Sequence, residues 1–247
     1  MAVNIEKFKE IFGKLYAKLM EFSLEEEFLN NMGQSLEIFY DLKQGEEYEF
    51  DATKEFLFLT WFLLDVDLSF LDENEDPGYL IDKFIARKAD VLSIQEIQIC
   101  QALKETSLNL LEIKAASPKG DSMTMCDAFT GKTFEVYESF GNEAQAKPGD
   151  LLFSRILTLG DYNILVGAGI FLDGSLKEYI TQDYTDAYHD VCEKGERCNF
   201  KEFLKDNGYL LNHWIKAYER GDLTGDGNGD DEDDNPEGDD NNGDKEK

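Results

Sequence analysis

The sequence has few of the residues on which catalytic and metal-binding motifs usually depend. Among its 247 residues there are two histidines, four cysteines, four prolines and two tryptophans. A Ser-His-Asp or Cys-His arrangement would therefore have to use His189 or His213. The chain has no Gly-x-Ser-x-Gly elbow and no Gly-x-x-x-x-Gly-Lys phosphate loop. The sequence thus points to no particular reaction.

Basic residues are also scarce. The 53 acidic residues outnumber the 24 lysines and arginines and give a formal net charge of −29. A chain of this charge repels phosphate backbones and anionic lipid surfaces, so we predict neither a nucleic-acid nor a membrane partner. We expect a protein partner instead.

Long hydrophobic runs are absent as well. The best candidate, residues 56–64, is shorter than the ~18 to 20 apolar residues that a membrane span needs. Residues 1–10 lack an apolar secretory segment, so we expect the cytoplasm as the compartment. In that compartment the cysteines at 100, 126, 192 and 198 are expected to be reduced thiols and not a disulfide framework.

The apolar pattern predicts an α+β fold that begins with a helical region over residues 1–105. Apolar residues recur every three or four positions from Ile5 to Phe22, as on one face of a helix. Further helices are expected over residues 24–39, 53–64 and 94–104, and from Asp76-Pro77 onward. Ser23, Ser93 and Ser175 each precede a glutamate by three residues, which predicts capping boxes at helix starts.

The pattern then changes to short strands over residues 106–173. Strands are expected at 108–115, 123–129, 132–139, 150–157 and 163–171, separated by turn sequences rich in glycine. Five short strands joined by tight turns predict a small antiparallel β barrel or a strongly curved sheet.

Helices return over residues 174–220 and are expected to pack on the body. The last segment, residues 221–247, contains 12 acidic and 2 basic residues, with Leu223 as its single large apolar side chain. Such a segment cannot bury enough apolar area to offset the entropy of ordering, so we predict a disordered acidic tail.

Two segments contain side chains that could bind a metal. His189, Cys192 and Cys198 have zinc-ligand chemistry, but their spacing is loose and two idle or buried thiols are the simpler interpretation. In the tail, Asp222, Thr224, Asp226, Asp230 and Asp233 supply oxygens at spacings that partly resemble a calcium loop. Gly229 stands where such a loop needs an aliphatic residue, and diffuse counterion binding is the alternative. We predict no cofactor, with calcium on the tail as the exception to test.

Several short motifs occur in an order that is similar to a group of uncharacterised bacterial proteins. The motifs are Trp61-Phe62-Leu63-Leu64-Asp65, Leu92-Ser93, Leu111-Glu112-Ile113, Asp127 with Thr130-Gly131-Lys132, Val136-Tyr137-Glu138, and Pro148-Gly149-Asp150 with Arg155. Many proteins of that group carry a SEC-C zinc motif, which is absent from this chain. The resemblance covers about residues 55–172 and implies an α+β bacterial cytosolic protein without an assigned activity.

The lack of catalytic motifs favours a non-catalytic binding or regulatory module. The candidate binding residues are Asp65, Asp127, Thr130, Gly131, Asp150 and Arg155. We expect Asp127, Thr130 and Arg155 to lie near one rim of the β module, with the helical part docked against it.

Two alternatives stay open. The first is a hydrolase that uses carboxylates or a bound metal; it predicts that Asp65 and Asp127, or His189 and Cys192, converge in a pocket. Asp65 and Asp67 could also form a carboxylate pair, although a helix end meeting solvent is the simpler interpretation. The second is an acidic decoy that occupies nucleic-acid-binding surfaces of other proteins.

Overall fold

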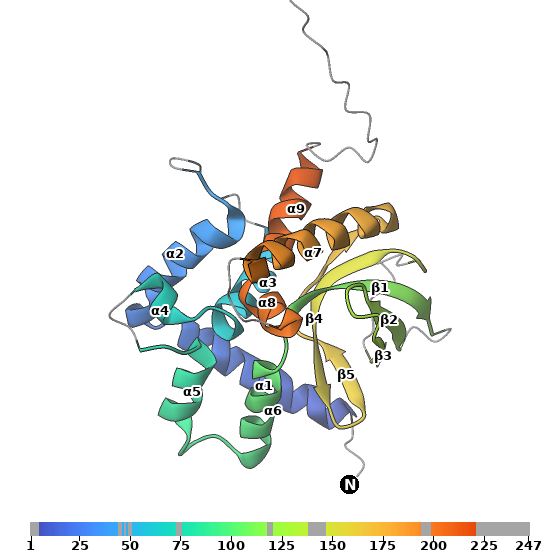
Figure 1. Cartoon of the computed structure of the whole chain (residues 1–247). Coiled ribbons are helices and arrows are strands. Elements are labelled where there is room, and N and C mark those ends of the chain that lie inside the picture. Colours follow the sequence, from blue (N-terminus) through green and yellow to red (C-terminus); the bar gives the residue numbers. More distant parts are fainter. Residues whose placement is uncertain are drawn as a thin grey trace, which may run out of the picture.

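The computed structural model describes the chain in several stretches that end at Arg220. These are residues 5–43, 46, 48, 51–72, 76–117, 121–137, 147–193 and 199–220. Figure 1 shows helices α1 to α6 on one side of the molecule, strands on the other, and helices α7 to α9 across the junction. The α+β class is therefore confirmed. The predicted tail lies outside the described residues.

Helices make up the first part of the described chain. They are α1 (Ile5–Ser23), the 3-10 helix η1 (Glu26–Phe28), α2 (Leu29–Tyr40), α3 (Ala52–Leu64), α4 (Leu68–Leu71), α5 (Leu80–Lys88) and α6 (Ile94–Lys104). Helix α1 buries the predicted apolar stripe, and α3 buries most of its second half. Ser93 opens α6 with both hydrogen bonds of the predicted capping box.

The predicted capping boxes at Ser23 and Ser175 are wrong. Ser23 is the last residue of α1, and its hydroxyl donates to the Met20 carbonyl oxygen at 2.7 Å. Ser175 lies within the 3-10 helix η2 (Gly174–Leu176), which Asp173 caps by accepting a hydrogen bond from the Ser175 N–H.

The predicted start of a helix at Asp76-Pro77 is also wrong. Helix α5 begins at Leu80, with Tyr79 as its N-cap residue in an extended conformation. Tyr79 forms an isolated antiparallel bridge with Asp67, and the Leu68 N–H donates to the Gly78 carbonyl oxygen. This bridge holds the chain extended up to the first residue of α5.

Strands of the second part close into a small barrel. They are β1 (Leu108–Ala116), β2 (Met123–Asp127), β3 (Thr133–Val136), β4 (Leu151–Leu159), β5 (Tyr162–Leu165) and β6 (Ile170–Leu172). The order is β1-β2-β3-β5-β4, and β4 pairs with β1 to close the barrel, while β6 adds to β4. The predicted barrel is confirmed, and its β3–β5 pairing is parallel, whereas the other pairings are antiparallel.

The fifth predicted strand, residues 163–171, is divided into two. Gly167 has a φ of 76°, in the left-handed region that favours glycine, and it separates β5 from β6. The bend lets β5 continue the barrel while β6 pairs with the other end of β4. A single glycine therefore converts one predicted strand into two strands with different neighbours.

Two groups of apolar side chains lie on the two faces of the strands. The barrel interior holds a fully buried set: Leu111, Ile113, Met123, Met125, Val136, Leu152 and Leu165. Side chains on the outer face of β1 and β4, such as Leu110 and Phe153, join the core of the helices. Because side chains alternate along a strand, Arg155 lies on the same face of β4 as Phe153, toward the helices.

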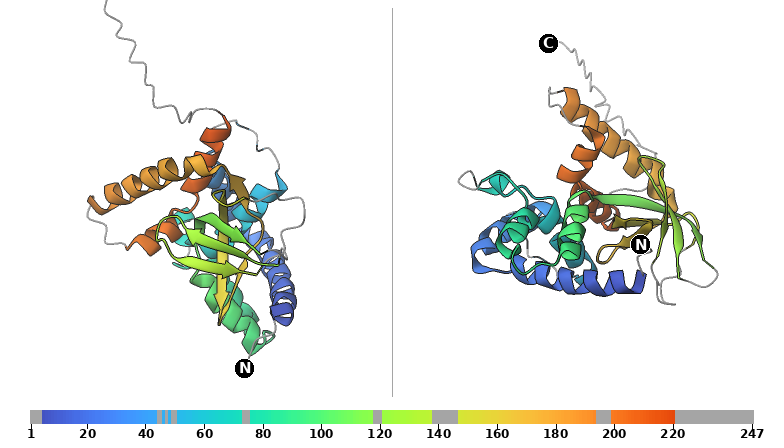
Figure 2. Two further views of the ribbon diagram at one scale, coloured as in Figure 1. Left: turned by 90° about the vertical axis from the view of Figure 1, so that its right-hand side faces the viewer. Right: turned by 90° about the horizontal axis from the view of Figure 1, so that it is seen from below.

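The last helices pack on this shared core. They are α7 (Lys177–Glu193), α8 (Phe200–Asp206) and α9 (Leu210–Glu219). Figure 2 shows α7 and α1 on opposite sides of the strands in the left-hand view. The Asn212 amide donates to the Phe39 carbonyl oxygen at 2.8 Å, which ties α9 to the end of α2. None of the helices in the described ranges has the length and apolar character that crossing a bilayer requires.

Candidate functional site

A group of buried charged side chains lies where β4, α3 and α8 meet. The Arg155 guanidinium forms an ion pair with both carboxylate oxygens of Asp65, with Nη1 to Oδ1 at 3.2 Å and Nη2 to Oδ2. Arg155 Nη1 also donates to the Thr106 hydroxyl at 2.9 Å, and Lys205 Nζ donates to Asp65 Oδ1 at 3.0 Å. The Arg155 and Asp65 side chains are wholly buried. We call these four residues the charge centre.

Lys205 also ties two helix ends together. Its ammonium donates to the carbonyl oxygens of Leu64 at 2.8 Å and Lys104 at 2.9 Å, which lie at the C-terminal ends of α3 and α6. Those oxygens have no partner within their own helices, and a cation there is favoured by the helix dipole. Burial lowers the pKa of Lys205, and the neighbouring Asp65 opposes that shift. The charge centre therefore fixes the relative position of α3, α6 and α8.

Helix α8 separates two cavities. The interhelical cavity, of about 460 Å³, is lined by Ile38, Trp61, Asp65, Val66, Asp67, Phe70, Leu71, Tyr79, Val191, Phe203, Asp206, Asn207 and Tyr209. The barrel-mouth cavity, of about 680 Å³, is lined by Ala102, Glu105, Thr106, Ser107, Asn109, Leu111, Asp127, Thr130, Lys132, Phe134, Ile156, Thr158, Phe200, Lys201 and Leu204. Asp65 lines the first cavity and Thr106 the second, so the charge centre lies between them.

Three carboxylates line the interhelical cavity, and they differ in their hydrogen bonding. Asp65 belongs to the charge centre. Asp67 caps α4, because its Oδ1 accepts hydrogen bonds from the Ser69 N–H and hydroxyl and from the Gly78 N–H. Among the described residues, Asp206 accepts no hydrogen bond at its carboxylate. It is the one of the three whose two carboxylate oxygens both lack a hydrogen bond from the described residues.

The electrostatics of the cavity are those of a negatively charged site. Burial raises the pKa of Asp206, and the nearby Asp65 raises it further against the opposing effect of Lys205. Tyr79 has its pKa raised to about 12, first by burial and then by the charges of Asp206, Asp65, Asp67 and Asp82. Burial therefore disfavours a charge of either sign in the cavity, and the neighbouring carboxylates further disfavour a negative charge relative to a cation.

Aromatic side chains form much of the remaining wall. The Trp61 and Tyr209 rings lie 5.4 Å apart between centroids, and the Lys205 ammonium lies 4.7 Å from the Tyr79 ring centroid. The Trp61 indole N–H is buried and has no acceptor within the described part of the chain. Phe70 lines the cavity with 79% of its surface exposed, so the cavity has an apolar residue that a partner could touch.

Asp127, Thr130 and Gly131 form a hairpin turn at the second cavity. The carboxylate of Asp127 accepts from the N–H groups of Phe129 and Thr130 through Oδ1, and from the Asn109 amide through Oδ2 at 2.7 Å. Gly131 has a φ of 72°, which a turn of this kind requires. These bonds give Asp127 a structural role in the turn between β2 and β3.

The remaining predicted residues are not gathered on one rim. Asp150 Oδ2 accepts from the Lys147 N–H at 2.8 Å, within the turn that precedes β4. Arg155 does not lie beside Asp127 and Thr130 on the barrel rim as expected, because its side chain leaves the helix-facing side of β4. Asp65 and Asp127 line different cavities, so the pocket expected from their convergence does not form.

The predicted metal ligands lie largely outside the described residues. This holds for Cys198 and for Asp222, Thr224, Asp226, Asp230 and Asp233 in the tail. His189 and Cys192 are both on α7, where the His189 ring contacts Tyr188. Within the described ranges, no three histidine, cysteine or acidic side chains are grouped so as to hold a metal ion.

A comparison of the sequence with models of protein families found one family. A model described as a family of unknown function, DUF7986, matches residues 4–207. The chain belongs to the DUF7986 family. The DUF7986 match spans the whole barrel-mouth lining and every residue of the interhelical lining except Tyr209. The description of this family does not show the expected association with a SEC-C motif. Comparisons with curated proteins and with solved structures gave no match.

Four residues that define these sites were not anticipated from the sequence. Thr106, Tyr79, Lys205 and Asp206 lie in or next to short elements whose register depends on tertiary packing. One signal was available: an arginine within the apolar strand sequence Leu151–Leu159 requires a buried carboxylate partner. Asp65, directly after the apolar helix, satisfies that requirement.

Proposed function

We propose that the protein is a non-catalytic binding module whose interhelical cavity receives an organic cation, the side chain of a lysine or arginine on a partner protein. The proposal depends most on Asp206, a carboxylate without a hydrogen-bonding partner among the described residues, in a cavity walled by aromatic rings. A carboxylate and aromatic faces together are the surroundings in which proteins bind ammonium and guanidinium groups.

The charges around the cavity support the sign of the ligand. Asp65, Asp67 and Asp206 line it, and the two cations of the charge centre, Arg155 and Lys205, offset two of them. One negative charge is left without compensation. The formal charge of −29 on the whole chain adds a long-range attraction for basic partners.

A protein partner fits the open side of the cavity better than a small enclosed ligand does. Phe70 is largely exposed and lines the cavity, so a polypeptide that inserts one basic side chain would also cover this ring. Exposed aromatic residues beside a pocket are common anchors in protein interfaces.

The same carboxylates support acid–base catalysis less well. A mechanism with two carboxylates needs one proton donor and one acceptor that can both reach a substrate. Asp65 is engaged by two cations, and Asp67 Oδ1 is engaged in capping α4. Asp206 alone would have to supply the chemistry, whereas one carboxylate suffices to bind a cation.

Trp61 offers a direct assay of the cavity. The chain has two tryptophans, so the Trp214→Phe variant leaves Trp61 as the single tryptophan, and selective excitation of tryptophan reports on it. This variant would be titrated with Nα-acetyl-lysine amide, Nα-acetyl-arginine amide and the uncharged Nα-acetyl-norleucine amide. One charged hydrogen bond and one cation–π contact predict a Kd on the order of 1–10 mM for the better cation.

The controls separate charge recognition from apolar contact. We expect at least one cationic probe to bind about tenfold more tightly than the norleucine derivative, and Asp206→Asn to abolish that preference. Asp161→Asn removes the same charge from an exposed turn between β4 and β5 and should leave the preference unchanged. Equal binding of charged and uncharged probes, or an intact preference in Asp206→Asn, would refute the proposal.

One further probe tests the source of the cation. If n-butylammonium binds but the amino-acid derivatives do not, the ligand is a small free amine and the protein-partner proposal is wrong. If the derivatives bind at least as tightly as n-butylammonium, the cavity accepts a side chain attached to a polypeptide backbone, as proposed.

A further inference from the structure

The barrel-mouth cavity is separate from the interhelical cavity and has a different lining. Its floor consists of Leu111, Phe134 and Ile156, which are side chains of the barrel interior that lie at its open end. Phe200 and Leu204 of α8 form the facing wall. The volume of about 680 Å³ lies within the range of known small-molecule sites, and mouths of β-barrels are frequent places for them.

Most polar groups at this cavity already have partners. Glu105 is paired with Lys201 at 2.6 Å. Both carboxylate oxygens of Asp127 accept hydrogen bonds, two at Oδ1 and one at Oδ2. The Thr158 hydroxyl donates to Asn163 Oδ1 at 2.7 Å. None of these groups needs a ligand to satisfy it.

Lys132 also lines this cavity. Its ammonium lies 4.6 Å from the ring centroid of Phe134 on the floor, and within the described part of the chain it has no carboxylate partner. The N–H donors of the Lys132 ammonium therefore lie beside the apolar floor of the cavity.

We propose that the barrel-mouth cavity is a second binding site, for a small carboxylic acid with a short apolar tail. The tail would lie against Phe134 and Ile156, and the carboxylate would accept hydrogen bonds from the Lys132 ammonium. Apolar contact then supplies most of the affinity, and the exposed ion pair selects the anionic head group. This site goes beyond the proposed function, because it uses a different cavity and a ligand of opposite charge.

The methionines of the chain provide a reporter on each side of the molecule. Met125 pairs across the sheet with Phe134 on the cavity floor, and Met123 pairs with Val136 further along the same two strands. Met20 and Met32 belong to the helical part and serve as internal controls. The full chain labelled with ¹³C at the methionine methyl groups would be titrated with sodium octanoate, and separately with octanol and octylammonium chloride.

We expect octanoate to shift the Met125 methyl signal saturably while the Met20 and Met32 signals stay in place. Octanol, which has the same chain without the charge, should bind about fivefold more weakly, and octylammonium more weakly still. Lys132→Met keeps the aliphatic stem and should reduce octanoate binding to the level of octanol. Lys147→Met, which removes a lysine outside the cavity lining, should change nothing.

Each other result overturns the proposal. Equal binding of octanoate and octanol, or an unchanged octanoate affinity in Lys132→Met, would show that the carboxylate is not recognised. Shifts spread over all methionines without saturation, or no shift at all, would show that no site exists at the barrel mouth. The methyl spectrum of each variant reports at the same time whether it is folded.

Discussion

Asp65 is the residue whose replacement tests the charge centre most sharply. Asp65→Asn keeps the size of the side chain and removes only its charge, so no cavity is created. Arg155, which is fully buried, would then lose its ion pair and one of the two carboxylate oxygens that accept from it, and Lys205 would lose its carboxylate. Removing one partner of a buried ion pair typically costs about 3–5 kcal/mol. That is a large fraction of a typical unfolding free energy of roughly 5–15 kcal/mol.

The assay is urea unfolding followed by far-UV circular dichroism, with midpoints compared at a common m-value. Glu105→Gln serves as the control, because it breaks the exposed Glu105–Lys201 pair and should cost less than about 1 kcal/mol. If Asp65→Asn destabilises the protein no more than this control does, the charge centre does not hold the helices as described.

A triple replacement checks the physical reason for that cost. Asp65→Leu, Arg155→Met and Lys205→Met together remove all three charges, so no buried charge is left without a partner. Apolar replacements of whole buried ion pairs are often neutral or stabilising. We therefore expect the triple variant to be more stable than Asp65→Asn. The opposite order would mean that lost packing, or the loss of the Lys205 bonds to the Leu64 and Lys104 carbonyl oxygens, costs more than an unpaired buried charge.

Three further predictions concern capping, close packing and the free carboxylate. The pKa of Glu96 is lowered from 4.5 to about 2, chiefly by its hydrogen bond with Lys18. The ionised Glu96 carboxylate therefore stabilises the folded state above pH 4.5, and this stabilisation is lost as the pH falls toward 2. Glu96→Gln should make the free energy of unfolding less dependent on pH in that window. Gly174→Ala should lower the free energy of unfolding in urea by about 1–3 kcal/mol, because the new Cβ would lie 2.1 Å from the Gly149 carbonyl oxygen. Gly13→Ala, which adds a Cβ in open space in the middle of α1, should instead raise the free energy of unfolding by about 0.5–1 kcal/mol. The pKa of Asp206 is raised, so its ionised form disfavours the folded state above that pKa; Asp206→Asn should leave Tm at neutral pH equal or higher, and a lower Tm would contradict this.

Periodicity was sufficient to predict the architecture. Apolar spacing identified α1 and the change from helices to strands, because burial of one face imposes a period that is visible in the sequence. Helix α3 was identified instead as a nearly continuous apolar run, and it is buried on most sides. The parallel β3–β5 pairing was not predictable, since it joins strands that are not consecutive and has Val136 and Asn163 as its one pair of register partners. The two failed capping boxes have a local cause: Ser23 still belongs to α1, and Ser175 lies within η2, which Asp173 caps.

The candidate sites were predictable only in part. Asp65, Asp127 and Arg155 were selected from motifs, yet the sequence could not show that Arg155 faces the helices and pairs with Asp65 from 90 positions away. Lys205 and Asp206 are adjacent in sequence, but one is buried in the charge centre and the other faces a cavity. Which of these two side chains faces the cavity depends on how α8 packs against the other elements, and that packing is not visible in the sequence.

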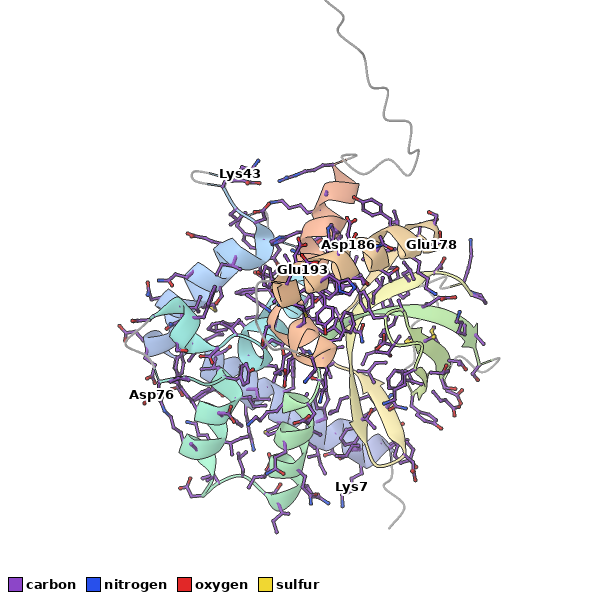
Figure 3. All side chains as sticks on the ribbon, in the orientation of Figure 1. Lys7, Lys43, Asp76, Glu178, Asp186 and Glu193 are labelled. Carbon is purple, nitrogen blue, oxygen red and sulfur yellow. The ribbon has the colours of Figure 1, made fainter. Side chains whose placement is uncertain are left out.

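The composition gives the number of acidic residues but not where they lie on the surface. Figure 3 labels acidic residues that lie apart on the surface, with Asp76 at one side of the view and Glu178 toward the other. Spread acidity of this kind raises the general attraction for basic partners. Selectivity then has to come from a local arrangement, for which the interhelical cavity is the candidate.

A crystal structure of the protein soaked with Nα-acetyl-arginine amide tests the cation site most directly. We predict the guanidinium in the interhelical cavity, within hydrogen-bonding distance of the Asp206 carboxylate and against the Tyr79 or Tyr209 ring. An empty cavity under conditions where the probe binds elsewhere, or a bound probe whose guanidinium points away from Asp206, would contradict the proposal.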